Sequence, residues 1–207
     1  MMKKLSFFLC ALLFAAQSFA DVTEPKTGVA FPESKDAGGK SLALAGAGLR
    51  SKMMVKVYAG ALYLDPAVKT ELASFKGQAT KPTQALYDAI CKGTFAKLFV
   101  LHFVRDVGKD KITESFSEGL EKSMDVQGAN ASAVKTFLDA SAVDMKEGQV
   151  LAVMVSGDEV VVTTPTGESK TVKSAALAAG VPAIWLGKDP VSEDLKKGMV
   201  SRLPSLL

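Results

Sequence analysis

One stretch, LALAGAGLRSKMMVKVYAGALYL from Leu42 to Leu64, limits the possible folds of this chain more than any other feature. It is mostly apolar, and the apolar residues cover both faces of an extended chain, which is typical of strands buried on both sides. Its charged side chains lie in its middle third: Arg50, Lys52 and Lys56. The stretch predicts long buried strands, whose cations either all face solvent or include one held against the core to meet an anion.

The first twenty residues have the pattern of a secretory signal peptide. Lys3 and Lys4 precede the apolar run 5–16, and Ser18-Phe19-Ala20 resembles a small-residue cleavage site. We expect cleavage after Ala20, which leaves one domain over residues 21–207 without an integral membrane segment. The lysine-rich leader, together with a single thiol in the mature chain, predicts a periplasmic protein.

The charge of the mature chain excludes one class of partner. Loss of Lys3 and Lys4 lowers the net charge from +3 to +1. A charge so near zero argues against nucleic acid as a partner and against a strong electrostatic attraction to anionic lipid. The sequence gives no indication of the oligomeric state.

The mature chain alternates between strand and helix patterns. We expect strands over 28–31, 42–49, 53–64, 96–107, 149–155, 160–164 and 168–172. We expect helices over 66–75, 83–92 and 173–179, with further helices that begin at Asp110, Asn130 and Ser192. Turns are predicted at 34–40 and 156–159. This order predicts an α+β fold in which a large antiparallel sheet is covered mainly on one side by helices.

The residue types that usually carry catalysis or bind metals are scarce. Cys91 is the mature chain's one cysteine and is interpreted as a buried, unreactive thiol. His102 is the one histidine and is interpreted as a hydrogen-bonded strand residue. No carboxylate cluster accompanies these two side chains, so we expect neither a metal nor a cofactor. Trp185 is expected to fill the core beneath the last helix.

Two glycines and one aromatic residue surround the cations of the central stretch. Gly46 and Gly48 indicate a close approach to the strand, either by a packed helix or by a ligand. Arg50 and Tyr58 are separated by an even number of residues, so both would lie on one sheet face if the chain stayed extended. A guanidinium and a phenol together can bind a carboxylate, although solvated charges beside a strand turn remain the alternative.

Several ordered motifs resemble the chalcone isomerase-like superfamily. Gly46-Ala-Gly-Leu-Arg50 matches a GxGxR segment, and Met54-Val-Lys-Val-Tyr58-Ala-Gly-Ala-Leu-Tyr63 matches the VK-x-[TY]-A-x-x-x-Y-L strand that follows it. Three further pieces occur in the family's order: Gly93 to Lys97, Phe116 to Leu120, and Trp185 to Ser192 with Ser201-Arg-Leu203. The resemblance implies an open-faced sandwich with a ligand cleft between the sheet and the helices.

The resemblance does not by itself imply catalysis. In the plant isomerases the Arg that matches Arg50 helps to stabilise negative charge, and a Thr stands at the position of Tyr58. A further Tyr and Asn of those enzymes have no match near the start of the helix predicted at Asp110. These differences argue against isomerase activity.

The fatty-acid-binding members of the superfamily are more similar, since they have Arg and Tyr at these positions. The resemblance therefore implies that Arg50 and Tyr58 bind the head group of a fatty acid or similar amphipathic or aromatic carboxylate, and we expect Met53 and Met54 near its tail. Lys52 and Lys56 are expected to be solvated. Two alternatives stay open: an isomerase or lyase acting on a chalcone-like substrate, and a ligand-free structural or partner-binding domain.

Overall fold

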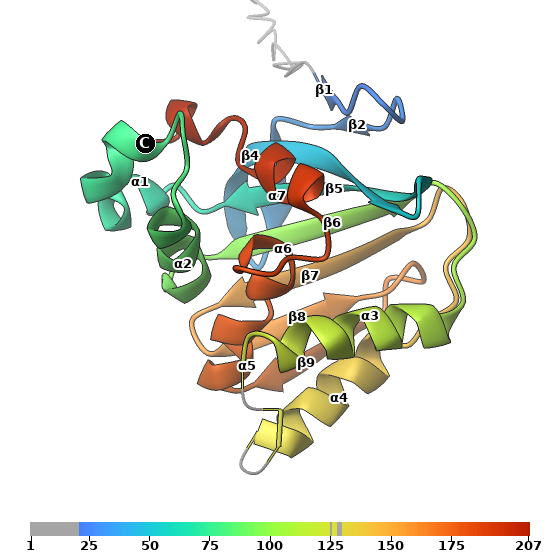
Figure 1. Ribbon diagram of the computed structural model, residues 1–207. Helices are drawn as coiled ribbons and strands as arrows, with labels where there is room; N and C mark the ends of the chain where they lie inside the picture. Colours follow the sequence, from blue (N-terminus) through green and yellow to red (C-terminus); the bar gives the residue numbers. More distant parts are fainter. Residues whose placement is uncertain (1–20, 125, 128–129) are drawn as a thin grey trace, which may run out of the picture.

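Seven antiparallel strands form the main sheet of the protein in the computed structural model, which describes residues 21–124, 126–127 and 130–207 (Figure 1). The predicted signal peptide lies outside the described residues. The strands occur in the sheet in their order along the chain: β3 (Ser34–Ala37), β4 (Lys40–Lys52), β5 (Val55–Leu64), β6 (Lys97–Phe103), β7 (Val150–Ser156), β8 (Glu159–Thr163) and β9 (Ser169–Lys173). Two short strands, β1 (Val22–Thr23) and β2 (Ala30–Phe31), pair separately.

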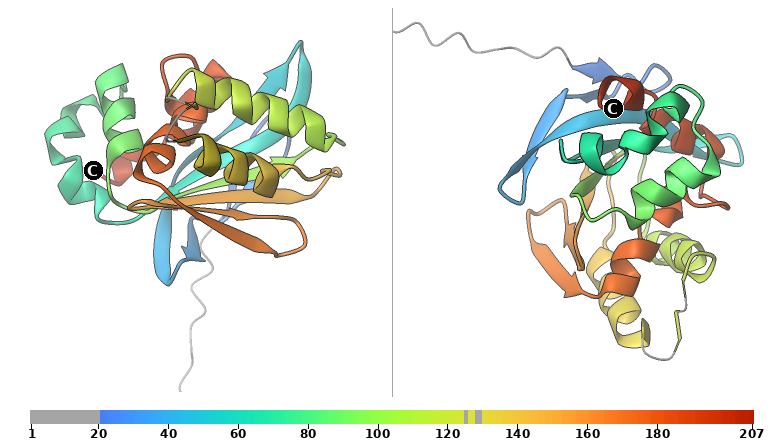
Figure 2. Two further views of the ribbon diagram at one scale, coloured as in Figure 1. Left: turned by 90° about the horizontal axis from the view of Figure 1, so that it is seen from below. Right: turned by 90° about the vertical axis from the view of Figure 1, so that its left-hand side faces the viewer.

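The connections and the C-terminal region supply the helices. Between β5 and β6 lie α1 (Val68–Glu71), η1 (Ala73–Gln78) and α2 (Gln84–Lys92), and between β6 and β7 lie α3 (Lys109–Glu121) and α4 (Ala131–Ser141). After β9 come α5 (Ala175–Gly180), α6 (Ala183–Leu186), α7 (Glu193–Met199) and η3 (Leu203–Ser205). The helix layer lies on one side of the sheet (Figure 2). The predicted α+β class and antiparallel sheet are confirmed.

The larger core fills the space between the sheet and the helices. Trp185 of α6 is fully buried there, with its ring stacked on Phe99 of β6 at a centroid distance of 4.5 Å. Phe116 of α3 meets the same indole edge-on at 5.8 Å. Aromatic rings of this size remove a large apolar area from water, so they fix α3 and α6 against the centre of the sheet.

The opposite sheet face carries a smaller core near the N-terminal strands. It includes Phe31 of β2, Leu42 and Leu44 of β4, and Tyr63 of β5, all buried. Because successive strand residues alternate between faces, β5 contributes Tyr58 and Leu62 to the helix side and Tyr63 to this one. The expected strand covered on both faces is therefore present.

The two glycines of the central stretch allow a helix to approach β4 closely. A Cβ on Gly48 would lie 3.0 Å from the Cα of Gly198 in α7, and one on Gly46 would clash with the Gly198 carbonyl oxygen. The close approach therefore belongs to α7, which packs on β4 and β5. Of the two interpretations of these glycines, the packed helix is correct.

Several predicted boundaries were wrong, chiefly at turns. The segment predicted as strand from Met53 begins instead at Val55, because Lys52 pairs with Val55 and residues 53–54 form a two-residue hairpin turn. The predicted turn at 34–40 contains β3, paired with β4. The β7–β8 turn is shorter than expected, since Ser156 pairs with Glu159.

Helix starts were predicted with mixed success. Thr83 caps α2, its hydroxyl oxygen accepting a hydrogen bond from the Leu86 amide, and Ser192 caps α7 in the same way. Asp110 does not cap α3, which begins one residue earlier after Gly108, although its carboxylate lies in the first turn. Asn130 precedes α4 without a side-chain cap. Among the described residues, no helix has the length and apolar character needed to cross a membrane.

Candidate functional site

Arg50 and Tyr58 lie directly opposite each other on β4 and β5. The two-residue turn at 53–54 brings their strands together, and a register shift follows Arg50. Directly paired residues of antiparallel strands point to the same face, and here that face is the helix side. The two side chains therefore share a face, as expected, but through a hairpin rather than through one continuous strand.

The guanidinium of Arg50 is buried and incompletely satisfied. Arg50 is only 9% exposed, and its Nη2 donates a hydrogen bond to Ser115 Oγ of α3 at 3.1 Å. Its Cζ lies 5.6 Å from the centroid of the Tyr58 ring. Its Nε is buried without a hydrogen-bond partner, and no carboxylate of the described residues lies within ion-pair distance of the side chain. A buried cation without a counter-ion is costly, so this environment favours an anionic ligand.

The phenol of Tyr58 lies behind Arg50, within the core. Its hydroxyl accepts a hydrogen bond from Trp185 Nε1 at 3.0 Å, and its ring lies 5.3 Å from that of Phe103. Burial raises the pKa of Tyr58, an effect that the nearby Arg50 charge and the Trp185 hydrogen bond only partly oppose. The phenol is therefore neutral near pH 7 and keeps its proton. In this structure the Tyr58 ring lies on the core side of the Arg50 guanidinium, and Tyr58 does not line the adjoining pocket.

A pocket of about 310 Å³ opens beside Arg50, at the edge of the sheet–helix interface. Its polar lining consists of four cations and one carboxylate: Arg50, Lys52, Arg105, Lys111 and Asp106. Its apolar lining is formed by Met53, Val55, Val57 and Val107. An apolar pocket with a few converging charged groups is the usual form of a site for a small amphipathic molecule.

Most of the positive charge in this pocket is not neutralised locally. Asp106 forms an ion pair with Lys146 at 2.8 Å, which holds the pKa of its carboxyl below the ordinary value. Lys111 pairs with Glu114 at 2.7 Å. Lys52 and Arg105 form no ion pair with any described carboxylate, and neither does Arg50. We conclude that the pocket has a positive potential suited to an anion.

The two methionines predicted to line the ligand tail are largely exposed. Met53 is 89% exposed and lines the pocket only at its rim, and Met54, at 99%, does not line it. Met54 therefore lies outside this pocket, because the turn directs its side chain outward, and its contact with a ligand tail stays a prediction. Lys52 and Lys56 are exposed, as expected.

Arg105 and Lys111 were missed by sequence reasoning. Arg105 follows the end of β6, where Phe103 pairs with Tyr58, and Lys111 lies in the first turns of α3. Only the register between β5 and β6 brings these side chains to Arg50. A basic residue just beyond a strand gives no sign of this in the sequence.

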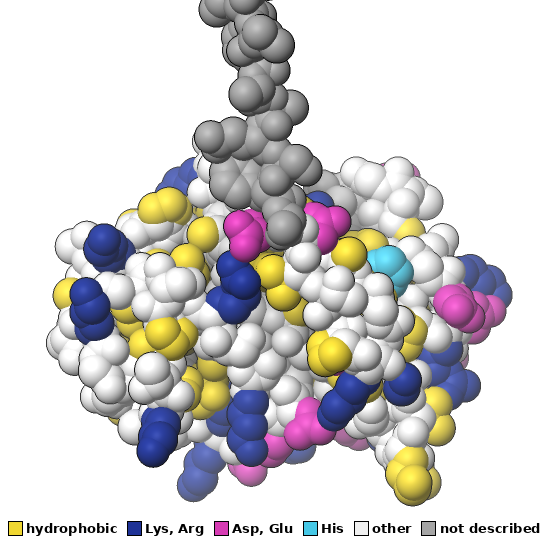
Figure 3. Space-filling view, turned by 90° about the horizontal axis from the view of Figure 1, so that it is seen from above, with side chains coloured by type: hydrophobic (Ala, Val, Ile, Leu, Met, Phe, Trp, Pro, Cys, Tyr) yellow, Lys and Arg dark blue, Asp and Glu magenta, His cyan; other side chains and the backbone are white. Residues whose placement is uncertain are grey.

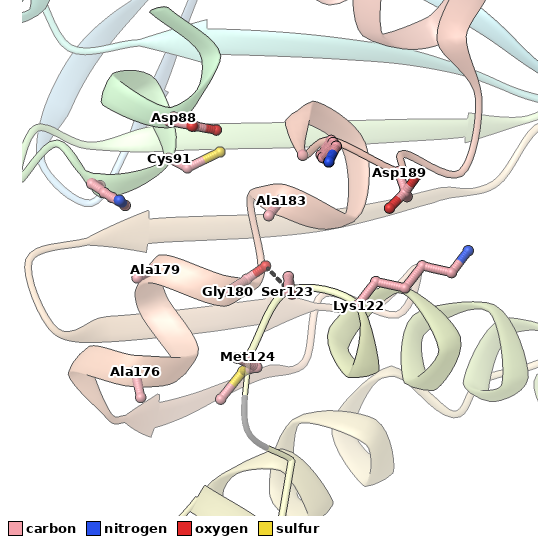
Figure 4. Close-up of a pocket in the computed structure, with 13 residues that line it drawn as sticks. Asp88, Cys91, Lys122, Ser123, Met124, Ala176, Ala179, Gly180, Ala183 and Asp189 are labelled. Atoms are coloured by element: carbon pink, nitrogen blue, oxygen red, sulfur yellow. Dashed lines mark hydrogen bonds between the residues drawn. The ribbon is translucent and has the colours of Figure 1, made fainter. Parts of the chain in front are cut away.

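A second pocket, of about 380 Å³, lies between α2, the end of α3 and α5–α6 (Figure 4). Cys91 is at its wall, where burial raises the pKa of the thiol to about 12, so the thiol is protonated and unreactive. Asp88 and Asp189 line it together with three lysines. Among the described residues, no buried polar atom without a partner lines this pocket, so it has weaker support than the Arg50 pocket.

His102 is partly exposed on the other sheet face, where its ring is visible at the surface (Figure 3). It lines a pocket of about 350 Å³ with Lys26, Lys56 and Glu147. No group of three or more potential metal ligands occurs within the described part of the chain.

Comparison with known proteins gives a consistent result. A family model described as "Chalcone isomerase-like" matches residues 24–201. Chalcone–flavanone isomerase 1A of Glycine max is 28% identical over 83% of this chain and 88% of its own length, and chalcone–flavanone isomerase of Phaseolus vulgaris is 27% identical over 81% and 85%. The crystal structure of a fatty-acid binding protein of Arabidopsis thaliana superposes with a TM-score of 0.74 at 19% identity, covering 90% of this chain and 98% of that one.

Proposed function

Because the chain belongs to the chalcone isomerase-like family, we propose that it binds a fatty acid or a similar small amphipathic carboxylate, with Arg50 on the head group. The observation that carries this proposal is the buried Arg50 guanidinium, which has an unpartnered Nε and opens onto a positive, partly apolar pocket. The fold is shared with a protein that binds fatty acids, and this supports the proposal at the level of fold.

The pocket fits the proposed ligand class in chemistry and in size. A guanidinium donates two parallel hydrogen bonds to a carboxylate, and Lys52 and Arg105 add long-range attraction. The valines of the pocket would contact the first methylenes of the tail. A volume of about 310 Å³ is near the lower end of the roughly 300–1,000 Å³ range of ligand pockets. Trp185, Tyr58 and Phe103 fill the interior behind it, so a long tail would leave across the rim at Met53.

Native mass spectrometry of the protein purified from its host tests this function. We expect a bound carboxylate in the wild type, or uptake of added oleate, and loss of both in Arg50→Ala. Lys56→Ala is the matched control, because Lys56 is an exposed cation of the same hairpin that does not line the pocket. A wild type that is empty and also ignores oleate would contradict the proposal.

Isomerisation of a chalcone-like phenol is the second candidate. It is favoured by the similarity to two chalcone–flavanone isomerases. It is disfavoured by Tyr58. The plant enzymes are expected to have a Thr at this position that orders a water, whereas the Tyr58 hydroxyl is buried and accepts a hydrogen bond from Trp185. Incubation with a hydroxychalcone, followed by its visible absorbance, decides this candidate: no rate above that of buffer excludes it.

A ligand-free structural or partner-binding domain is the third candidate. It requires a sheet–helix interface too tightly packed for a ligand, and the aromatic core around Trp185 fits that description. The open pocket beside Arg50 does not. An empty protein by mass spectrometry, with no uptake of any carboxylate, would favour this third function.

We also propose export of the protein to the periplasm. The proposal rests on the charged, apolar and small-residue segments of residues 1–20. Amino-terminal sequencing of protein from the periplasmic fraction should begin at Asp21. Recovery of the intact chain from the cytoplasm alone would contradict export.

A further inference from the structure

The β4–β5 hairpin ends in a projecting apolar tip. Met53, Met54 and Val55 are 89%, 99% and 43% exposed, and they are the exposed large hydrophobic residues of the described chain. They are consecutive, and the hairpin that carries them extends from the body of the molecule in both Figure 1 and Figure 2. Single exposed apolar residues are normal, but a cluster of all of them at one tip indicates a contact surface.

The turn at this tip has residues that are unfavourable for folding. Met53 and Met54 have φ angles of 49° and 66°, which lie in the left-handed region. Two-residue hairpin turns with positive φ at both positions strongly favour Asn-Gly or Gly-Gly, because larger side chains are strained there. The two methionines thus accept backbone strain and also gain no burial. Neither the strained backbone nor the exposure of these side chains stabilises the isolated protein, so both indicate a contact with another molecule.

Positive charge lies beside the tip. Lys52 and Lys56 flank it in sequence and are exposed, and Arg105 lies with Lys52 in the adjoining pocket. The Lys56 ammonium donates a hydrogen bond to the Lys26 carbonyl oxygen, so Lys52 and Arg105 are the cations on the pocket side of the tip. The one carboxylate of that pocket, Asp106, is already paired with Lys146. Apolar side chains that project beside cations match the surface of an anionic bilayer, where the cations meet phosphates and the apolar groups enter the acyl boundary.

We propose that the tip formed by Met53, Met54 and Val55 docks on an anionic lipid surface. The small net charge of the protein does not oppose this contact, because the attraction is local to the hairpin. Met53 belongs both to the tip and to the pocket rim, so docking turns the pocket mouth toward the lipid. An amphipathic carboxylate can then pass between the bilayer and Arg50 with its tail shielded from water. The passage of a carboxylate between bilayer and pocket rests on the proposed function, whereas docking of the tip on lipid does not.

Co-sedimentation with vesicles tests the contact. The protein purified from its host is mixed with phosphatidylcholine vesicles that either contain or lack phosphatidylglycerol. We expect binding to the anionic vesicles that weakens as salt is added. Met54→Gly should bind about tenfold more weakly, since one apolar side chain leaves the bilayer. Its melting temperature should not fall, because glycine suits the positive φ at this position.

Met54→Leu is the matched control, since it keeps an apolar side chain at the same position and should keep vesicle binding. The proposal is overturned if the wild type ignores anionic vesicles or if Met54→Gly binds them as the wild type does. It is also overturned if Met54→Gly only dissociates a dimer, which would assign the tip to a second copy of this chain.

The mass-spectrometric measurement of bound carboxylate separates the two proposals. Met54 does not line the pocket, so Met54→Gly should keep its ligand. A protein that retains ligand but ignores vesicles contradicts docking alone. A protein that binds vesicles but never a carboxylate contradicts the proposed function alone.

Discussion

Two regions of this molecule bury cations in different ways. At one, Lys97 is 1% exposed, and its Nζ donates to the carbonyl oxygens of Gly93 and Phe95 at 2.6 and 3.0 Å. It also lies 4.6 Å from the centroid of the Phe95 ring. At the other, Arg50 has one side-chain hydrogen bond, to Ser115, and a buried Nε without a partner. Lys97 faces a closed core, whereas Arg50 faces an open pocket.

The difference separates a structural cation from one available to a ligand. A buried ammonium whose protons all meet carbonyls and an aromatic face contributes to the fold and has no capacity left for a partner. A guanidinium with an unused donor can still bind a partner, although burying that unpaired donor destabilises the folded protein. Lys196 belongs with Lys97, since its Nζ donates to Gly187 O at 2.7 Å and to Gln84 Oε1 at 2.8 Å.

The largest expected effect is on folding stability. Lys97→Ala should lower the free energy of unfolding by about 3 kcal/mol, because it leaves a cavity and two buried carbonyl oxygens without donors. Arg50→Ala should change it by less than about 1 kcal/mol, since the lost contacts are offset by removal of an unpaired buried donor. Urea denaturation measures both. Equal losses would show that the two cations have the same role.

A smaller effect is expected in the pH dependence of stability. Burial lowers the pKa of Lys97 from its ordinary value of 10.5 to about 8. Between pH 8 and 10 the unfolded chain therefore holds a proton on Lys97 that the folded protein has released, so the contribution of Lys97 to the free energy of unfolding should rise with pH by about 2 kcal/mol. Lys97→Met should lack this rise.

Other buried groups oppose this rise from about pH 9 upward. Burial raises the pKa of the Cys91 thiol from 9.0 to about 12 and also raises the pKa of Tyr58, Tyr63 and Tyr87, so these groups ionise more readily in the unfolded chain and lower stability as the pH rises. The difference between the wild type and Lys97→Met at each pH removes this shared contribution. A flat difference curve would contradict the role assigned to Lys97.

The smallest expected effect concerns Tyr58. Tyr58→Phe removes the acceptor of the buried Trp185 indole and should lower the free energy of unfolding by about 1 kcal/mol. It should weaken carboxylate binding by only about threefold, because the Arg50 guanidinium keeps its cation–π contact with the ring. Calorimetry with the same variant measures both quantities. Loss of binding as large as in an Arg50 variant would show that the phenol itself holds the ligand.

The sheet and its helix layer could be predicted because their signals are local. The apolar run of β5 and the hydroxyl cap at Thr83 each indicate their element without knowledge of distant residues. The inward position of Arg50 was predicted from the resemblance of its motif to the family and from its even spacing to Tyr58. The rest of the pocket was not, because Arg105 reaches Arg50 only through the register between β5 and β6.

The turn between the two central strands was predicted too early, at 50–52, for a different reason. Met53 and Met54 do not favour positive φ, so the sequence has no turn signal at these residues and the second strand was predicted to begin at Met53. The same absence of Gly and Asn makes the exposed tip unusual once the structure is known. The usual preference for Gly or Asn in such turns is therefore not followed at the place where the molecule has its candidate contact surface.

Isothermal titration with decanoate and with decanol tests the central claim, that Arg50 binds a carboxylate, most directly. The two ligands share a tail and differ in the head group. The wild type should bind decanoate about a hundredfold more tightly than decanol, and Arg50→Met should bind the two with similar affinity. Lys56→Ala should keep the preference of the wild type. If Arg50→Met keeps the full preference for decanoate, the carboxylate is held elsewhere and the account is wrong.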